Sequence, residues 1–165
     1  MQNVKKLLIF IVQDSVVFRD LIVGYLKSKN YKNLKTFKTG EECLKYIHLK
    51  PKIIILDYSF EGITGLELMK RVKDEHPEID FIFLSGQNDV QVAVNIMKLG
   101  AADYIVKNDK APQNLVNSVE YLVSGERKEK IKKGFQIGVI GFFIMMFLLV
   151  MIIILLTIFL EDFSL

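Results

Sequence analysis

The sequence predicts an α/β fold, a doubly wound five-stranded parallel sheet, followed by one C-terminal transmembrane helix. Short and nearly continuous apolar runs alternate with longer segments in which apolar residues recur three and four positions apart. Apolar runs of this kind are typical of strands that are covered on both faces in a parallel sheet. Near the C-terminus, a separate apolar segment is long enough to cross a lipid bilayer.

Strand and helix segments are expected to alternate along the first three quarters of the chain. The second strand is more polar than the others, which suits an edge position. The expected strands are 7–12, 34–37, 53–56, 81–84 and 104–106. The expected helices are 15–29, 39–49, 64–75, 90–99 and 112–123. Right-handed crossovers would place these helices on both faces of the sheet.

Composition excludes several classes of protein. Hydrophobic residues make up 51% of the 165 residues, and the excess over an ordinary soluble domain lies in the C-terminal apolar segment. Disorder and collagen-like repeats are therefore excluded. The single Cys43 forms no internal disulfide, and with only His48 and His76 beside it no Cys/His metal knuckle is expected. Residues 1–125 show no basic field that would indicate nucleic-acid binding.

The apolar segment 134–160 contains 27 residues without a charge, 22 of them hydrophobic, and is predicted to be a transmembrane helix. Five basic residues lie in 126–133 just before it, and none follows it. By the positive-inside rule, the N-terminal part stays in the cytoplasm. The expected organisation is a soluble domain over 1–124, a basic juxtamembrane linker over 125–133, the membrane span, and a short extracytoplasmic tail over 161–165.

Polar residues end four of the predicted strands. The first strand is followed by Gln13 and Asp14, the third by Asp57, the fourth by Ser85 and the fifth by Lys107. In open α/β sheets, ligands gather at the carboxyl ends of the strands, so these side chains are expected to converge. Two carboxylates suit a divalent cation such as Mg²⁺, and a lysine with a hydroxyl suits the oxygens of a phosphoryl group.

Over residues 4–124 the chain resembles the receiver domain of two-component response regulators. The resemblance rests on the segments IVQDSVVFRDLI, IIILDYSFEGITGLELMKRVK and FIFLSGQNDVQVAVNIMKLGAADYIVK. It implies a flavodoxin-like strand order, 2-1-3-4-5. It also implies that Asp57 accepts a phosphoryl group from a histidine kinase, a phosphotransfer protein or a small phosphodonor. Such a domain is a signalling switch rather than an enzyme, although it can phosphorylate itself from small donors and remove the phosphoryl group.

The same resemblance assigns roles to the other residues at the strand ends. Ser85 matches the hydroxyl residue that contacts the phosphoryl group, and Lys107 matches the lysine that pairs with it. Tyr104 matches the aromatic switch residue, which turns inward when the hydroxyl residue moves.

The implied cofactor is Mg²⁺, held by Asp14, Asp57 and the backbone carbonyl of Ser59. Gln13 departs from the family pattern, which has a second acidic residue at that position. An amide can hydrogen-bond a metal-bound water but supplies no charge, so the affinity for Mg²⁺ is expected to fall. No organic cofactor is expected.

The leading hypothesis is a single-domain response regulator tethered to the bacterial cytoplasmic (inner) membrane. It would signal through protein contacts with a membrane-bound partner, because the linker leaves no room for an output domain. Gly134 and Gly138 would permit close approach of two spanning helices, and so a homodimer. The alternative is a pseudo-receiver that binds partners without cycling phosphate, which Gln13 favours. An enzyme of the haloacid-dehalogenase type ranks last, because Ser59 stands where that family has a second acid.

Overall fold

Five parallel strands form the centre of the fold, in the order β2-β1-β3-β4-β5, as the resemblance implied. The computed structural model describes residues 7–60, 62–86, 89–125, 144–148 and 151. Each strand lies where the sequence predicted it, to within two residues at either end. The strands are β1 (Ile9–Val12), β2 (Leu34–Phe37), β3 (Ile53–Asp57), β4 (Asp80–Ser85) and β5 (Asp103–Val106).

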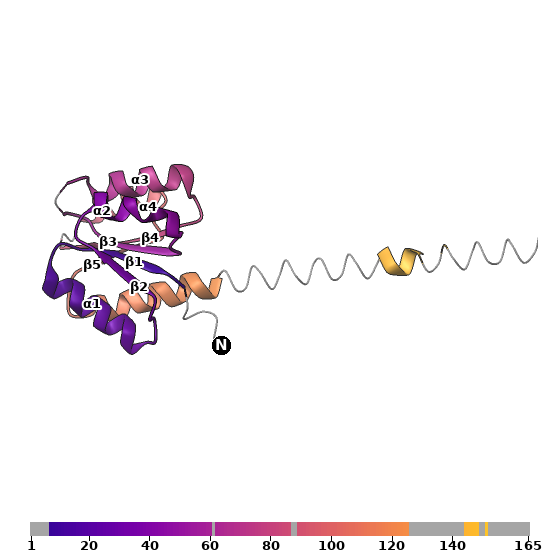
Figure 1. Ribbon diagram of the computed structural model, residues 1–165, viewed down its shortest axis with the longest axis horizontal. Helices are drawn as coiled ribbons and strands as arrows, with labels where there is room; N and C mark the ends of the chain where they lie inside the picture. Colours follow the sequence, from indigo (N-terminus) through magenta and orange to yellow (C-terminus); the bar gives the residue numbers. More distant parts are fainter. Residues whose placement is uncertain (1–6, 61, 87–88, 126–143, 149–150, 152–165) are drawn as a thin grey trace, which may run out of the picture. The chain divides into compact units, whose positions relative to one another are not determined.

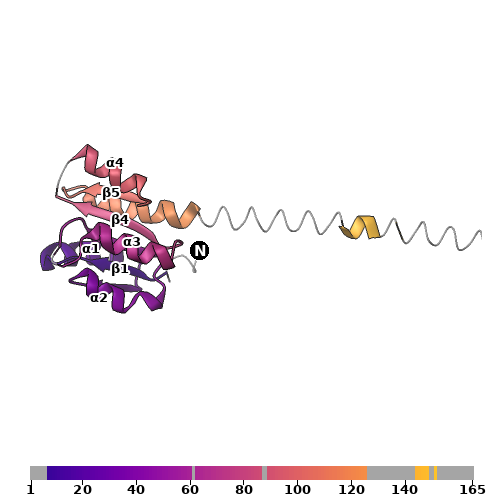
Figure 2. The same cartoon turned by 90° about the horizontal axis from the view of Figure 1, so that it is seen from above.

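Helices cover both faces of the sheet, which confirms the doubly wound arrangement. In Figure 1, α1 and the orange helix over 111–125 lie on one face, whereas α2, α3 and α4 lie on the other. Figure 2 shows α3 between α2 and α4. The helices are α1 (Val16–Ser28), α2 (Gly40–Lys45), the short 3₁₀ helix η2 (Ile47–Leu49), α3 (Gly65–Glu75), α4 (Val90–Lys98) and the 111–125 helix.

Successive strand residues point to opposite faces, and both faces are apolar. On β1, Ile9 and Ile11 join the core beneath α1 and the 111–125 helix, and Phe10 and Val12 join the core beneath α2, α3 and α4. All four side chains are fully buried. This two-sided burial is the physical reason that the strand sequences are continuously apolar rather than alternating.

Side-chain caps fix where four helices begin. Ser15, Thr39 and Thr64 each accept a hydrogen bond from the backbone N–H three residues later, at 3.4, 3.3 and 3.2 Å. Asp89 accepts two such bonds at the start of α4. These bonds satisfy N–H groups that have no partner within the helix. Because each cap begins the helix that comes after a strand, the caps also determine where the loops at the carboxyl edge of the sheet end.

The prediction of one continuous helix over 39–49 was wrong. The α-helix ends at Lys45, and the chain tightens into the 3₁₀ turn of η2. The backbone N–H of Tyr46 donates to Cys43 at 3.0 Å, three residues back instead of four. Lys50 then adopts a left-handed conformation with φ of 52°, and Pro51 follows. Proline has no N–H to continue a helical ladder, so the helix must finish before it.

The chain separates into two compact units, Met1–Val123 and Ser124–Leu165. Beyond residue 125, the structure describes only 144–148 and 151, all of which are helical. Within the described part of the chain, no helix combines the length and the apolar character that crossing a membrane requires. The remainder of the span predicted over 134–160 lies outside the described residues, so the transmembrane helix stays a prediction.

Two glycines offer a matched test of the packing. A Cβ on Gly65 would lie 2.8 Å from the backbone oxygen of Asp57 and 2.9 Å from a Leu56 methyl, whereas a Cβ on Gly24 meets nothing within 4 Å. Gly65→Ala is therefore expected to lower the free energy of unfolding by about 1–3 kcal/mol. Gly24→Ala, in the middle of exposed α1, is expected to raise it by about 0.5–1 kcal/mol. Urea denaturation of the full chain measures both, and equal effects would contradict the packing described at Gly65.

Candidate functional site

Asp57 and Lys107 meet at the carboxyl edge of the sheet although 50 residues separate them. The Nζ of Lys107 donates to Oδ2 of Asp57 in a short charge-assisted contact. Asp57 is the last residue of β3, and its side chain is 8% exposed, whereas that of Lys107 is 22% exposed. A carboxylate this deeply buried needs a compensating charge, and the lysine supplies it.

Ser85 belongs to the same cluster through the pairing of the strands. It ends β4 and is 1% exposed. Asp57 pairs in register with Leu84, the residue before Ser85, and the backbone N–H of Lys107 donates to the Ser85 carbonyl at 2.7 Å. The structure therefore brings Asp57, Ser85 and Lys107 together on three neighbouring strands, where the sequence predicted that they would converge.

Gln13 is buried beside this cluster with half of its amide unsatisfied. Val12 pairs in register with Leu56, so Gln13 and Asp57 follow on adjacent strands. Gln13 is 1% exposed, and its Oε1 accepts the backbone N–H of Ser15 at 3.2 Å. Since a backbone N–H can only donate, that contact fixes the orientation of the amide. The Nε2 group is then left buried without a hydrogen-bond partner, a cost of about 1–3 kcal/mol that an incoming acceptor would relieve.

Asp14 lies at the exposed side of the same edge. Its Oδ1 accepts the backbone N–H of Ser15 at 2.6 Å. Beside it is a hollow of about 450 Å³, which Lys38, Thr39 and Glu42 also line. Asp14 is the one predicted site residue among those that line this hollow.

The donor set at this edge fits Mg²⁺ with few protein ligands. Among the described residues, no three or more His, Cys, Asp or Glu side chains form a cluster that could hold a metal. Two carboxylates, those of Asp14 and Asp57, come from adjacent strands. Mg²⁺ commonly binds through one or two carboxylates and keeps several waters, so this set is sufficient. The unsatisfied Nε2 of Gln13 can only donate, so it suits an anionic acceptor such as a phosphoryl oxygen rather than a metal-bound water, which itself chiefly donates.

The predicted roles of Ser59, as a metal ligand through its carbonyl, and of Tyr104, as the switch residue, remain predictions. Ser59 donates its backbone N–H to Oδ1 of Asp57 at 3.3 Å, which shows that this loop folds back over the acidic side chain. Tyr104 is half-buried on β5 and pairs in register with Phe83. Together with Val94 and Met97 of α4, it lines a hollow of about 510 Å³.

Two residues near the site were missed by the sequence analysis. The ring centroid of Phe18, in the first turn of α1, lies 4.8 Å from Nζ of Lys107. Glu41 holds the loop after Asp57, since its Oε1 accepts the Ile63 N–H at 2.9 Å. Backbone hydrogen bonds, first from its own N–H and then from Ile63, lower the pKa of the Glu41 carboxyl. An acidic residue in the first turn after Thr39 was a signal for a cap, but nothing in the sequence indicated the contact of Phe18.

The remaining chemically active side chains do not add to the site. Cys43 is fully buried, and burial raises the pKa of its thiol to about 12, so it stays protonated and unreactive. His76 lies 3.7 Å from the Glu78 carboxylate, and His48 stacks loosely on Tyr46. These contacts make Cys43 a packing residue and leave the two histidines without a part in the candidate site.

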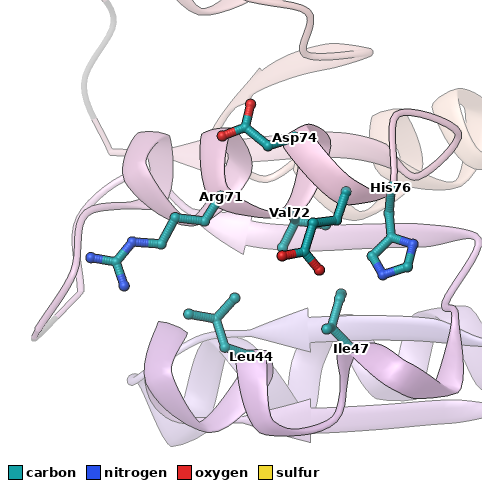
Figure 3. A pocket seen from close by; sticks show the side chains of 7 residues that line it. Leu44, Ile47, Arg71, Val72, Asp74 and His76 are labelled. Carbon is teal, nitrogen blue, oxygen red and sulfur yellow. The ribbon is translucent and has the colours of Figure 1, made fainter.

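A third hollow, of about 420 Å³, lies between α2–η2 and α3. Figure 3 shows Leu44 and Ile47 pointing toward Val72 across it, with charged side chains at its rim. None of the predicted site residues lines this hollow, so it forms no part of the candidate site. Its lining residues are Leu44, Ile47, Arg71, Val72, Asp74, Glu75 and His76.

Sheet order, strand-end chemistry and the contact between Asp57 and Lys107 together define a phosphoacceptor domain. The family model of the response regulator receiver domain matches residues 9–120, more than half of the chain. The chain therefore belongs to the response regulator receiver family. Membership makes it a phosphoacceptor signalling module, of a family that typically uses Mg²⁺ for phosphorylation.

Curated relatives share the domain but are longer proteins. An NtrX-like response regulator of Rickettsia typhi is 37% identical over 108 residues, covering 62% of this chain and 22% of that protein. The transcriptional regulatory protein CssR of Bacillus subtilis is 30% identical over 121 residues, covering 73% of this chain and 53% of that protein. The chain thus spans about a fifth to a half of the length of these relatives.

Solved receiver structures superpose on the same part of the chain. The receiver domain of NtrX from Brucella abortus matches with a TM-score of 0.65 at 29% identity, covering 70% of this chain and 98% of that one. A response regulator from Chloroflexus aurantiacus matches with a TM-score of 0.65 at 27% identity, covering 72% and 98%.

Replacing Gln13 by aspartate tests the metal site. Gln13→Asp restores a second negative charge beside Asp57, so the Mg²⁺ concentration for half-saturation is expected to fall roughly tenfold. Calorimetric titration of the full chain measures this directly. Gln91→Asp, which adds the same charge on exposed α4, is the control and should leave the midpoint unchanged. An unchanged midpoint in Gln13→Asp would show that residue 13 does not face the metal.

Proposed function

We propose that this protein is a membrane-tethered single-domain response regulator that accepts a phosphoryl group on Asp57 and signals through protein–protein contacts. The observation that carries the proposal is the contact between buried Asp57 and Lys107 at the carboxyl edge of the sheet. Of the two predicted strand-end acids, Asp57 is the one that contacts a lysine and that lies beside a strand ending in a buried hydroxyl residue.

The proposed chemistry is a direct transfer to a carboxylate. An Asp57 oxygen attacks the phosphorus of the donor, the bond from phosphorus to the donor breaks, and an acyl phosphate forms on Asp57. Bound Mg²⁺ would reduce the repulsion between the carboxylate and the anionic donor. Lys107 then exchanges its carboxylate partner for a phosphoryl oxygen, and the Ser85 hydroxyl donates a hydrogen bond to another oxygen.

The proposed output is a change in the surface formed by α4 and β5. Phosphorylation adds about one to two negative charges, and a Ser85 that moves toward them would vacate space for Tyr104. Tyr104 borders the hollow that Val94 and Met97 also line. Val90, Val94 and Met97 are 74%, 40% and 43% exposed, so apolar surface is available there for a partner. We place the contact with a membrane-bound protein on this surface.

The proposed tether is the apolar segment 134–160. Its composition and the basic residues before it support a single-pass helix in the bacterial inner membrane, with the receiver in the cytoplasm. The basic linker would also be attracted to anionic lipid headgroups. Confinement near the bilayer raises the effective concentration of the receiver toward other membrane proteins, so a weak contact would suffice for output.

The second candidate function is a pseudo-receiver that binds partners without phosphate. Buried Gln13 favours it, because the site holds one acidic group fewer for Mg²⁺ than the family pattern. The contact of Asp57 with Lys107 opposes it, because that pairing is what a phosphoacceptor requires.

The phosphoacceptor is tested with acetyl phosphate. The full chain incubated with Mg²⁺ is expected to gain one acid-labile phosphoryl group on Asp57, and Asp57→Asn should gain none. Asp14→Asn is the matched control, since it removes a carboxylate from the same edge but should only slow the reaction. Intact-mass spectrometry measures the product. Labelling that persists in Asp57→Asn would refute the assignment, and an unlabelled wild type at high Mg²⁺ would favour the pseudo-receiver.

The tether and the output surface are tested together in cells. The full chain is expected in the membrane fraction and resistant to carbonate extraction, whereas a chain ending at Gly125 should be soluble.

A thiol crosslinker at Met97→Cys is expected to capture a membrane protein from the full chain, and less of it from Asp57→Asn. The native Cys43 should not interfere, since its thiol is buried and protonated. If the truncated chain captured the same partner as efficiently, the tether would play no part in output.

A further inference from the structure

The ammonium of Lys107 has two partners of different kinds. It contacts Oδ2 of Asp57, and it also lies over the Phe18 ring, 4.8 Å from the ring centroid. Both neighbours attract a positive charge, one through a full negative charge and the other through the electron-rich face of the ring. Two contacts thus set the position of the ammonium.

The structure holds the Phe18 ring in place independently of Lys107. The backbone N–H of Phe18 donates to the Ser15 side chain at 3.4 Å, which fixes the first turn of α1. Phe18 is half-buried and packs against the core on the α1 face of the sheet, one turn before fully buried Ile22. Arg19 adds a contact at 3.5 Å to the backbone oxygen of Gln13, which links this turn to the end of β1.

A lysine at this position needs such a restraint. Its side chain has four flexible carbons, and ordering it at one point costs rotamer entropy. Asp57 alone would attract the ammonium but would not fix the direction from which it approaches. A ring face as a second contact restricts that direction, and partial burial strengthens the attraction relative to open solvent.

We propose that Phe18 is a positioning residue that holds the Lys107 ammonium over Asp57. It acts through Lys107 and does not touch the reacting atoms. This positioning is a property of the unphosphorylated protein and does not depend on the proposed function. Its effect on phosphoryl transfer rests on the proposed function. There, an ammonium already in place neutralises the developing charge on the phosphoryl oxygens, and the lysine side chain need not first find the right conformation.

The positioning is tested by NMR on the full chain with ¹³C-labelled lysine, without any phosphodonor. The ε-methylene protons of Lys107, assigned with Lys107→Arg, are expected to be shifted upfield by the ring current of Phe18. Phe18→Leu keeps an apolar side chain but should move the signal to the position of solvent-exposed lysines, whereas Phe18→Tyr should retain the shift. Tyr25→Leu, which removes another half-buried ring from the same helix, should leave Lys107 unchanged. The proposal would be overturned if the Lys107 signal of the wild type coincided with those of exposed lysines, or if its chemical shift were unchanged in Phe18→Leu.

The consequence for transfer is tested with acetyl phosphate at saturating Mg²⁺. Phe18→Leu is expected to lower the rate constant about two- to fivefold, the size of a cation–π contact at a partly exposed site. The Mg²⁺ midpoint should not change, and Phe18→Tyr should restore the rate. A loss of rate that Phe18→Tyr fails to restore, or that Tyr25→Leu reproduces, would show a merely structural role and refute the positioning. If the wild-type chain takes no phosphoryl group, the proposed function fails, and the NMR experiment still decides the position of Lys107.

Discussion

The parallel, in-register pairing of β1, β3, β4 and β5 is the constraint on which the candidate site depends. It brings the ends of four strands to one edge, so that residues far apart in the sequence become neighbours. Because both faces of the sheet are covered by apolar helices, Asp57 is held where water cannot fully solvate it. A buried charge of this kind is tolerated only with a partner, and removing one member of such a pair leaves the other uncompensated. Lys107 is therefore needed for the fold at this edge as well as for any chemistry there.

Gln13 shifts the balance of charge at that edge. Two carboxylates and one ammonium leave one excess negative charge, where a second acid in place of Gln13 would leave two. The smaller excess weakens the attraction for Mg²⁺ and also weakens the repulsion toward an anionic phosphodonor. The buried Nε2 does not offset the loss of attraction for Mg²⁺, because an N–H group presents positive charge, but it offers an oxyanion a donor that has no hydrogen-bond partner among the described residues.

The sequence predicted the sheet because its strands are buried on both faces. A short, continuous apolar run such as IIIL in β3 is typical of such a strand. It predicted Asp57, Ser85 and Lys107 because each ends one of those strands. It could not predict that the chain tightens after Tyr46, because the helical spacing of apolar residues continues through η2. The contact of Phe18 with Lys107 was also out of reach. Its residues lie far apart in the chain, and their meeting depends on how the first turn of α1 packs.

The proposed switch and the proposed output surface share β5. The backbone N–H of Lys107 bonds the Ser85 carbonyl, so the ends of β4 and β5 move together rather than separately. Three residues before Lys107, Tyr104 borders the hollow beside α4. A displacement of Lys107 toward a phosphoryl oxygen therefore acts on the same short strand that carries the switch residue. Because β5 lies at the edge of the sheet, with β4 as its only strand neighbour among the described residues, it can adjust without disturbing the pairing of β1, β3 and β4.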